Sequence, residues 1–195
     1  MKLLKTTFVF LFVLSITLFA QQKDDYSKYP GYFNYNDFAQ LKNAESITEV
    51  YLEEPLLKMV AGITQDKKEG LGNAIAGLKL VRVNEFKIPE SDFSNIETAV
   101  ESMDESLQSK NWDRIIRTNS KGNYTNVYIK KGSDDEFVGL TILSLDKNPK
   151  EATVNEKQWS KATFVNIVGK IDLSTMGKLS EQLKVPGLDK VKKEK

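Results

Sequence analysis

The stretch that decides the fold is Trp112–Leu145, which reads WDRIIRTNSKGNYTNVYIKKGSDDEFVGLTILSL. Three runs within it, WDRIIRT, YTNVYIKK and EFVGLTILSL, are rich in β-branched and aromatic residues and follow a period of two. The connections NSKGN and GSDD are short and contain glycine, which favours hairpins. The stretch therefore predicts three consecutive antiparallel strands.

Three further β-rich runs flank this stretch. ATFVNIVGKI follows it after a long polar connection. Upstream, ITEVYLEE predicts a strand from about Ile47 to Leu52, and AGLKLVRVNEF predicts another. Alternation in the latter run places Leu78, Leu80 and Arg82 on one face of the sheet.

Helical spacing appears in three places. Glu54-Pro55 opens PLLKMVAGI with proline at the first helical position, and TQDKKEGLGN after it is expected to be a loop. Ser91–Asn111 is the clearest helix, with Ser91 as its N-cap and an acidic face expected in solvent. The apolar residues of that helix are Phe93, Ile96, Val100, Met103 and Leu107, and its acidic face holds Glu97, Glu101, Asp104 and Glu105. The last helix, Leu173–Leu183, ends at Pro186-Gly187.

This order of elements predicts one α+β domain with a mainly antiparallel sheet of about five or six strands. About three helices are expected to pack on one face of the sheet. The predicted organisation is a signal peptide over residues 1–20, an aromatic-rich segment over 21–45, the α+β domain over 46–189 and a basic disordered tail over 190–195.

The N-terminus has the layout of a secretory signal peptide. Lys2 and Lys5 precede the apolar run Phe8–Phe19, and Ala20 offers a small residue for cleavage before Gln21. The alternative is an uncleaved N-terminal anchor. No other segment approaches 18 continuous apolar residues, so no membrane span is expected after removal of the signal. The sequence predicts export to the periplasm or beyond.

Six aromatic residues gather shortly after this signal. They are Tyr26, Tyr29, Tyr32, Phe33, Tyr35 and Phe38. One interpretation is an exposed strip that stacks on a sugar or a partner. The other is a segment that lies over the domain and is held there by its rings, which the irregular spacing and the Pro30-Gly31 turn favour.

The composition excludes several classes of function. The chain has no cysteine and no histidine, so it forms no disulfide, has no lipobox cysteine and lacks Ser-His-Asp and Cys-His catalysis. It also lacks the preferred ligands of zinc and copper. Loss of Lys2 and Lys5 leaves 26 basic residues against 27 acidic ones. Charges of both signs are dispersed, apart from the basic tail, so no nucleic-acid partner is expected.

Two Gly-Lys pairs resemble phosphate-binding loops only superficially. Gly169-Lys170 and Gly177-Lys178 lack both the earlier glycine and the following Ser or Thr of such a loop. The glycines at 70, 72 and 77 miss the spacing of the dinucleotide fingerprint. The pattern instead predicts a strand over Phe164–Val168, a turn at Gly169 and a helix capped by Asp172.

The remaining chemistry has weak support in the sequence. Ser174 lies near Lys170 and Lys178, but Ser and Lys are too common for that spacing to predict a catalytic pair. DKNPKEATVNEK has lysine and glutamate where a calcium loop needs other residues. Asp134, Asp135 and Glu136 fall at a predicted hairpin tip and are expected to form its acidic edge. No catalytic, cofactor-binding or metal-binding residue is predicted.

The segments ITEVYLEEPLLKMV, WDRIIRT, VYIKK, FVGLTILSLD and FVNIVGKIDLSTMGKLSEQL, in this order, resemble the domain of unknown function 4252 family. The resemblance extends from Phe38 to Asp189. It implies a small exported protein of the kind found mostly in Bacteroidota, and it supplies no catalytic residue. Many members of the family look like lipoproteins, whereas this chain has no lipobox cysteine.

Together these observations predict an exported, non-enzymatic domain that binds another cell-envelope protein and uses no cofactor. A small-ligand carrier in the periplasm and a hydrolase that uses paired carboxylates are the alternatives.

Overall fold

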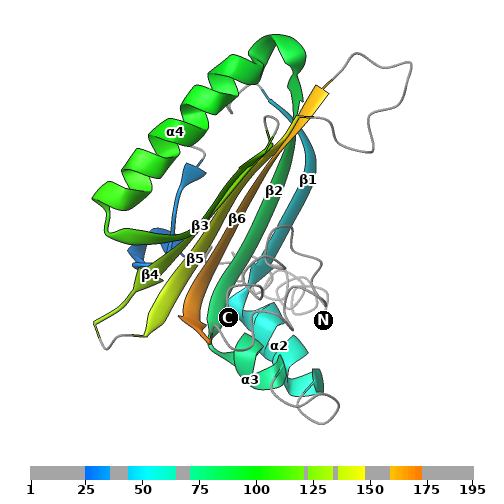
Figure 1. Ribbon diagram of the computed structural model, residues 1–195. Coiled ribbons are helices and arrows are strands. Elements are labelled where there is room, and N and C mark those ends of the chain that lie inside the picture. Colours follow the sequence, from blue (N-terminus) through cyan, green and yellow to red (C-terminus); the bar gives the residue numbers. More distant parts are fainter. Residues whose placement is uncertain are drawn as a thin grey trace, which may run out of the picture.

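The computed structural model describes residues 25–35, 44–64, 71–120, 123–133, 136–147 and 159–172 (Figure 1). Two 3-10 turns, η1 (Tyr26–Lys28) and η4 (Glu90–Asp92), accompany the main elements. The main elements are β1 (Glu45–Glu53), α2 (Glu54–Thr64), α3 (Leu71–Ala76), β2 (Leu78–Pro89), α4 (Phe93–Ser109), β3 (Trp112–Ser120), β4 (Asn123–Lys131), β5 (Phe137–Asp146) and β6 (Trp159–Ile171). All six predicted strands are present.

The strands form one sheet in the order β1-β2-β6-β5-β4-β3. Every neighbouring pair is antiparallel, which confirms the expected α+β class and both predicted hairpins. The last strand, β6, lies in the centre, where Val165 pairs with Val83 of β2 and with Ile142 of β5. A central strand is covered on both faces, which accounts for the nearly continuous apolar run of β6.

The helices are divided between the two faces of the sheet, not gathered on one face as the sequence predicted (Figure 1). Ile96 and Val100 of α4 pack with Phe164 of β6 on one face. Leu57 of α2 packs with Val165 on the other face, because successive residues of a strand point to opposite sides. Leu78 also lies on the α2 face, because a register shift between Leu78 and Leu80 separates it from Leu80 and Arg82.

The structure differs from the sequence predictions at Gly169 and at the starts of α4 and α3. Gly169 is not a turn, since β6 continues to Ile171 and Gly169 occupies the irregularity opposite Leu78 with φ +122°. The helix α4 begins after a 3-10 turn with Asp92 at the cap position, so Ser91 is not its N-cap. The helix α3 begins within the last three residues of the expected loop and continues to Ala76, where the sequence predicted the start of a strand.

The aromatic N-terminal segment packs onto the α4 face of the sheet. Phe33 and Tyr35 are buried with the α4 core, and Tyr26 is buried beside β2 and β6. The buried amide of Asn166 accepts a hydrogen bond from the Phe33 N–H at 3.0 Å and donates one to the Gly31 carbonyl at 3.0 Å. These contacts support the interpretation in which the rings hold the segment against the domain.

A buried arginine lies beneath this segment. The guanidinium of Arg82 lies 4.1 Å from the ring centre of Tyr35, and its Nε donates a 3.3 Å hydrogen bond to Asn84. Another of its nitrogens donates to the Tyr32 hydroxyl at 3.3 Å. The hydroxyl of Tyr35 also donates to Asn84, and burial raises the pKa of Tyr35. The N-terminal aromatic rings therefore shield a cation in the sheet.

Several sequence predictions lie outside the described residues. They are the signal peptide with its cleavage site at Ala20 and Gln21, Phe38, Asp134, Asp135, the helix Leu173–Leu183, and the basic tail.

Candidate functional site

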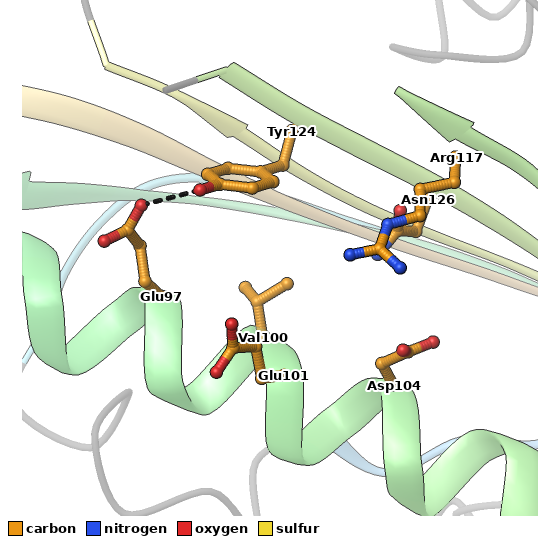
Figure 2. Close-up of a pocket in the computed structure, with 7 residues that line it drawn as sticks. All are labelled: Glu97, Val100, Glu101, Asp104, Arg117, Tyr124 and Asn126. Carbon is orange, nitrogen blue, oxygen red and sulfur yellow. Dashed lines mark hydrogen bonds between the residues drawn. The ribbon is translucent and has the colours of Figure 1, made fainter. Parts of the chain in front are cut away.

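A small pocket lies between α4 and the neighbouring strands β3 and β4 (Figure 2). The helix contributes Glu97, Val100, Glu101 and Asp104, and the strands contribute Arg117, Tyr124 and Asn126. The helical residues recur at three- and four-residue steps, which places them on one side of α4. The pocket has a cavity volume of about 40 Å³, room for roughly three water molecules.

Two tyrosines of β4 fasten the acidic side of α4 to the sheet. Tyr124 donates a 2.9 Å hydrogen bond to Glu97, and Tyr128 donates a 2.6 Å hydrogen bond to Asp104. Arg114 forms a 2.5 Å ion pair with the other oxygen of Asp104. The expectation of a fully solvated acidic face is therefore wrong for Glu97 and Asp104, although it holds for the exposed Glu101.

These contacts change the protonation behaviour of the groups involved. Partial burial alone would raise the pKa of Asp104, but hydrogen bonds from Tyr128, Arg114 and Gln108 outweigh it and hold that pKa below its usual value. Burial and the bond to Asp104 raise the pKa of Tyr128, and the bond to Glu97 raises the pKa of Tyr124. Asp104 is therefore an ionised structural anchor near neutral pH.

A β-bulge places two arginines on the pocket side of the sheet. Strict alternation would send Arg114 and Arg117 to opposite faces. A register shift between Arg114 and Ile116 instead pairs Arg114 with Tyr128 and Arg117 with Asn126. Sequence reasoning missed Arg117 as a pocket residue, because no local signal marked the bulge.

The buried side chain of Asn126 closes the sheet side of the pocket. Its exposed fraction is 6%, and its Oδ1 has no hydrogen-bond partner among the described residues. The same amide lowers the pKa of Tyr128 through a side-chain hydrogen bond. Because a buried acceptor without a partner costs free energy, this oxygen marks a place for an incoming donor.

The geometry limits the chemistry that the pocket can perform. A pair of carboxylates in a glycoside hydrolase needs one member with a raised pKa, whereas the pKa of Asp104 is lowered and both of its oxygens are engaged. In the part of the chain that the structure describes, no three His, Cys, Asp or Glu residues are grouped to hold a metal ion. The pocket has room only for a small group, and most of its lining is polar.

A second feature is an apolar stripe on α2, on the opposite face of the sheet. Leu56, Met59 and Ile63 are 40%, 57% and 59% exposed and follow one another at helical spacing. Val50 of β1 is exposed as well, at 36%. Among the described residues, these four are the exposed large apolar side chains.

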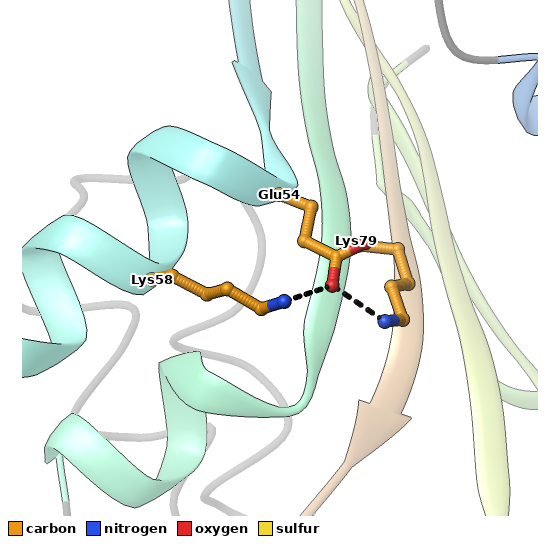
Figure 3. Close-up of polar contacts among 3 residues, drawn as sticks. All are labelled: Glu54, Lys58 and Lys79. Carbon is orange, nitrogen blue, oxygen red and sulfur yellow. Dashed lines mark hydrogen bonds and ion pairs between the residues drawn. The ribbon is translucent and has the colours of Figure 1, made fainter.

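Glu54 in the first turn of α2 forms two ion pairs, one within the helix and one with the sheet (Figure 3). Oε1 of Glu54 lies 2.7 Å from Nζ of Lys58 on α2 and 2.7 Å from Nζ of Lys79 on β2. The hydrogen bond from Lys58, together with that from Lys79, lowers the pKa of Glu54, and the bond to Glu54 raises the pKa of Lys79. The first turn of α2 is thereby tied to the sheet.

Other residues considered from the sequence have structural roles or fall outside the description. Lys170 is exposed at the end of β6 and pairs with Glu136. A side chain at Gly77 would approach the Lys170 carbonyl to 2.8 Å, so Gly77 serves close packing and not phosphate binding. Ser174 and Lys178 lie outside the described residues, as does most of DKNPKEATVNEK.

Over the described residues, the fold and the site define an α+β protein with one six-stranded antiparallel sheet and a small polar pocket beside α4. The chain belongs to the family described as Domain of unknown function (DUF4252), whose match covers residues 35–179 and so includes all six strands. Comparison with curated proteins and with solved structures gave no significant match. None of the described helices is long and apolar enough to cross a membrane.

Proposed function

We propose that the protein is an exported, non-catalytic domain that binds another cell-envelope protein through the apolar stripe on α2. The observation that carries the proposal is that Val50, Leu56, Met59 and Ile63, the large apolar side chains exposed among the described residues, all belong to β1 and α2. An exposed apolar cluster on neighbouring elements is typical of a protein-contact surface, since its burial releases water from apolar area. Methionine in such a stripe adapts its shape to a partner.

Two further observations support this contact surface. β1 is an edge strand of the sheet, so its outer backbone groups pair with no other strand among the described residues and could pair with a strand of a partner. The ion pair of Glu54 with Lys79 and the packing of Leu57 in the core attach α2 to the sheet, so the stripe is presented in one orientation. A preorganised surface loses less conformational entropy on binding than a flexible one.

The alternatives expected from the sequence receive less support. A cavity of about 40 Å³ is far below the roughly 300–1,000 Å³ of ordinary ligand sites, which disfavours a carrier that encloses its ligand there. The engaged, ionised state of Asp104 disfavours a hydrolase that would use it as the acid.

Site-specific photo-crosslinking tests the proposal. A photoreactive amino acid replaces Met59 in one form of the exported protein and Glu105, on the other face, in a matched form. We expect an adduct with one envelope protein from position 59 only, and loss of that adduct when Leu56 and Ile63 are changed to Ser. Equal adducts from both positions, or no adduct from position 59, would contradict the proposal. An adduct of twice the chain mass would also contradict it, because the stripe would then join copies of this chain.

A further inference from the structure

We infer that the pocket between α4 and β4 binds a primary ammonium group on an alkyl stem, such as a lysine side chain or a small free amine. The pocket lies on the face of the sheet opposite the apolar stripe of α2. The inference therefore stands apart from the proposed protein contact, and each can fail without the other.

The first argument is the unused acceptor of Asn126. The side chain is more than nine-tenths buried, it lines the pocket, and its Oδ1 has no partner among the described residues. The same side chain forms a hydrogen bond that lowers the pKa of Tyr128, as expected when the amide nitrogen is the donor, so Oδ1 stays without a partner. A ligand that enters with an N–H donor would satisfy the oxygen that folding leaves unpaired.

The second argument is the charge of the lining. Glu97, Glu101 and Asp104 face the pocket from α4, whereas Arg117 is the one basic residue that lines it (Figure 2). Tyr124 engages one oxygen of Glu97, and Tyr128 and Arg114 engage Asp104. Glu101 is exposed and forms no hydrogen bond or ion pair with another described residue. The lining therefore favours a cation over a neutral or anionic ligand.

Size and geometry select an ammonium group among cations. The described carboxylates do not form a group that could hold a metal ion. The cavity volume of about 40 Å³ suits a compact group, and a primary ammonium is compact and carries three donors. Such donors suit oxygen acceptors, and the pocket lining offers the Oδ1 of Asn126 and the carboxylate of Glu101. Arg117 opposes the same ligand, because like charges repel across the pocket.

Titration of the isotopically labelled exported protein with n-butylamine at neutral pH tests the inference by NMR. We expect saturable chemical-shift changes of the Asn126 side-chain amide and of the backbone amides of β4. The uncharged probe n-butanol, which has the same chain length, should cause no such changes. The matched titration with N-acetyl-lysine N-methylamide separates the two sources. Binding of both amine probes favours a lysine side chain as the ligand, whereas binding of butylamine alone favours a small free amine. Either result supports an ammonium site.

Three charge variants give the test a signature that water in the pocket would not produce. Glu101→Gln should weaken amine binding about three-fold, and Arg117→Gln should strengthen it by a similar factor, as expected for exposed charges. Glu105→Gln makes the same charge change on α4 outside the pocket lining and should leave the affinity unchanged. Shifts that do not saturate, equal shifts with butanol, or equal weakening by the Glu101 and Glu105 variants would overturn the inference.

Discussion

The hydroxyl of Tyr128 donates a 2.6 Å hydrogen bond to Asp104, which joins the centre of α4 to β4. Arg114 of β3 reaches the second oxygen of the same carboxylate at 2.5 Å. One side chain of the helix thus holds two strands. This contact fixes the distance between α4 and the sheet at the pocket, so it governs both stability and the shape of the candidate site.

Removing the Tyr128 hydroxyl should cost more stability than removing that of Tyr124. Tyr128→Phe leaves the partly buried Asp104 without one of its three hydrogen-bond partners, and we expect the free energy of unfolding to fall by about 1–2 kcal/mol. Tyr124→Phe breaks the bond to the more accessible Glu97 and should cost about 0.5 kcal/mol. Urea unfolding of both variants measures this difference. A larger loss in the Tyr124 variant would contradict the assigned role of Asp104.

The lowered pKa of Asp104 predicts how stability depends on pH. Because the folded-state pKa lies below the usual 3.8, the ionised carboxylate stabilises the fold above the unfolded-state pKa. That contribution is lost as the pH falls through the lower folded-state pKa. We expect the stability gap between the native protein and Asp104→Asn to close as the pH falls from about 5 to about 2. Urea unfolding across this range, with the exposed Glu105→Gln as a control, tests it. A gap of constant size would refute the prediction.

Two glycine substitutions should have opposite effects. A Cβ at Gly31 would lie 1.9 Å from the Val138 carbonyl oxygen, so Gly31→Ala must displace the N-terminal segment. We expect a loss of about 2–3 kcal/mol. Gly62 lies within α2 with open space around its Cβ position, so Gly62→Ala should stabilise by about 0.5–1 kcal/mol. Thermal unfolding measures both changes. Equal behaviour of the two variants would contradict the close approach at Gly31.

Asn166 should be the main attachment of the N-terminal segment. Asn166→Ala removes the acceptor of the Phe33 N–H and the donor to Gly31, Leu140 and Thr141, at an expected cost of about 2–4 kcal/mol. Hydrogen exchange should accelerate across residues 25–35 before the sheet unfolds. Asn123→Ala removes an exposed bond to the Lys147 N–H and should leave that exchange unchanged. Unchanged protection of residues 25–35 in the Asn166 variant would refute this attachment.

The sequence by itself determined the strands and the acidic and apolar sides of α4. Residues two apart in a strand, or three and four apart in a helix, share a side whatever the rest of the chain does. The hairpins were also predictable, because glycine-containing connections act over a few residues. For the candidate site, the sequence could therefore identify Glu97, Glu101 and Asp104 as neighbours.

Only the tertiary structure decided what those acids face. The bulge at Arg114–Ile116 brings Arg117 to the pocket, and strand pairing places Asn126 beside it. The sequence could not assign each helix to a face, since apolar side chains occur on both faces of the central strands. It favoured an aromatic segment that packs on the domain but could not identify the contacts that hold it, because Phe33 meets Asn166 across 133 residues. Contacts over such separations depend on the whole packed sheet, and no local pattern records them.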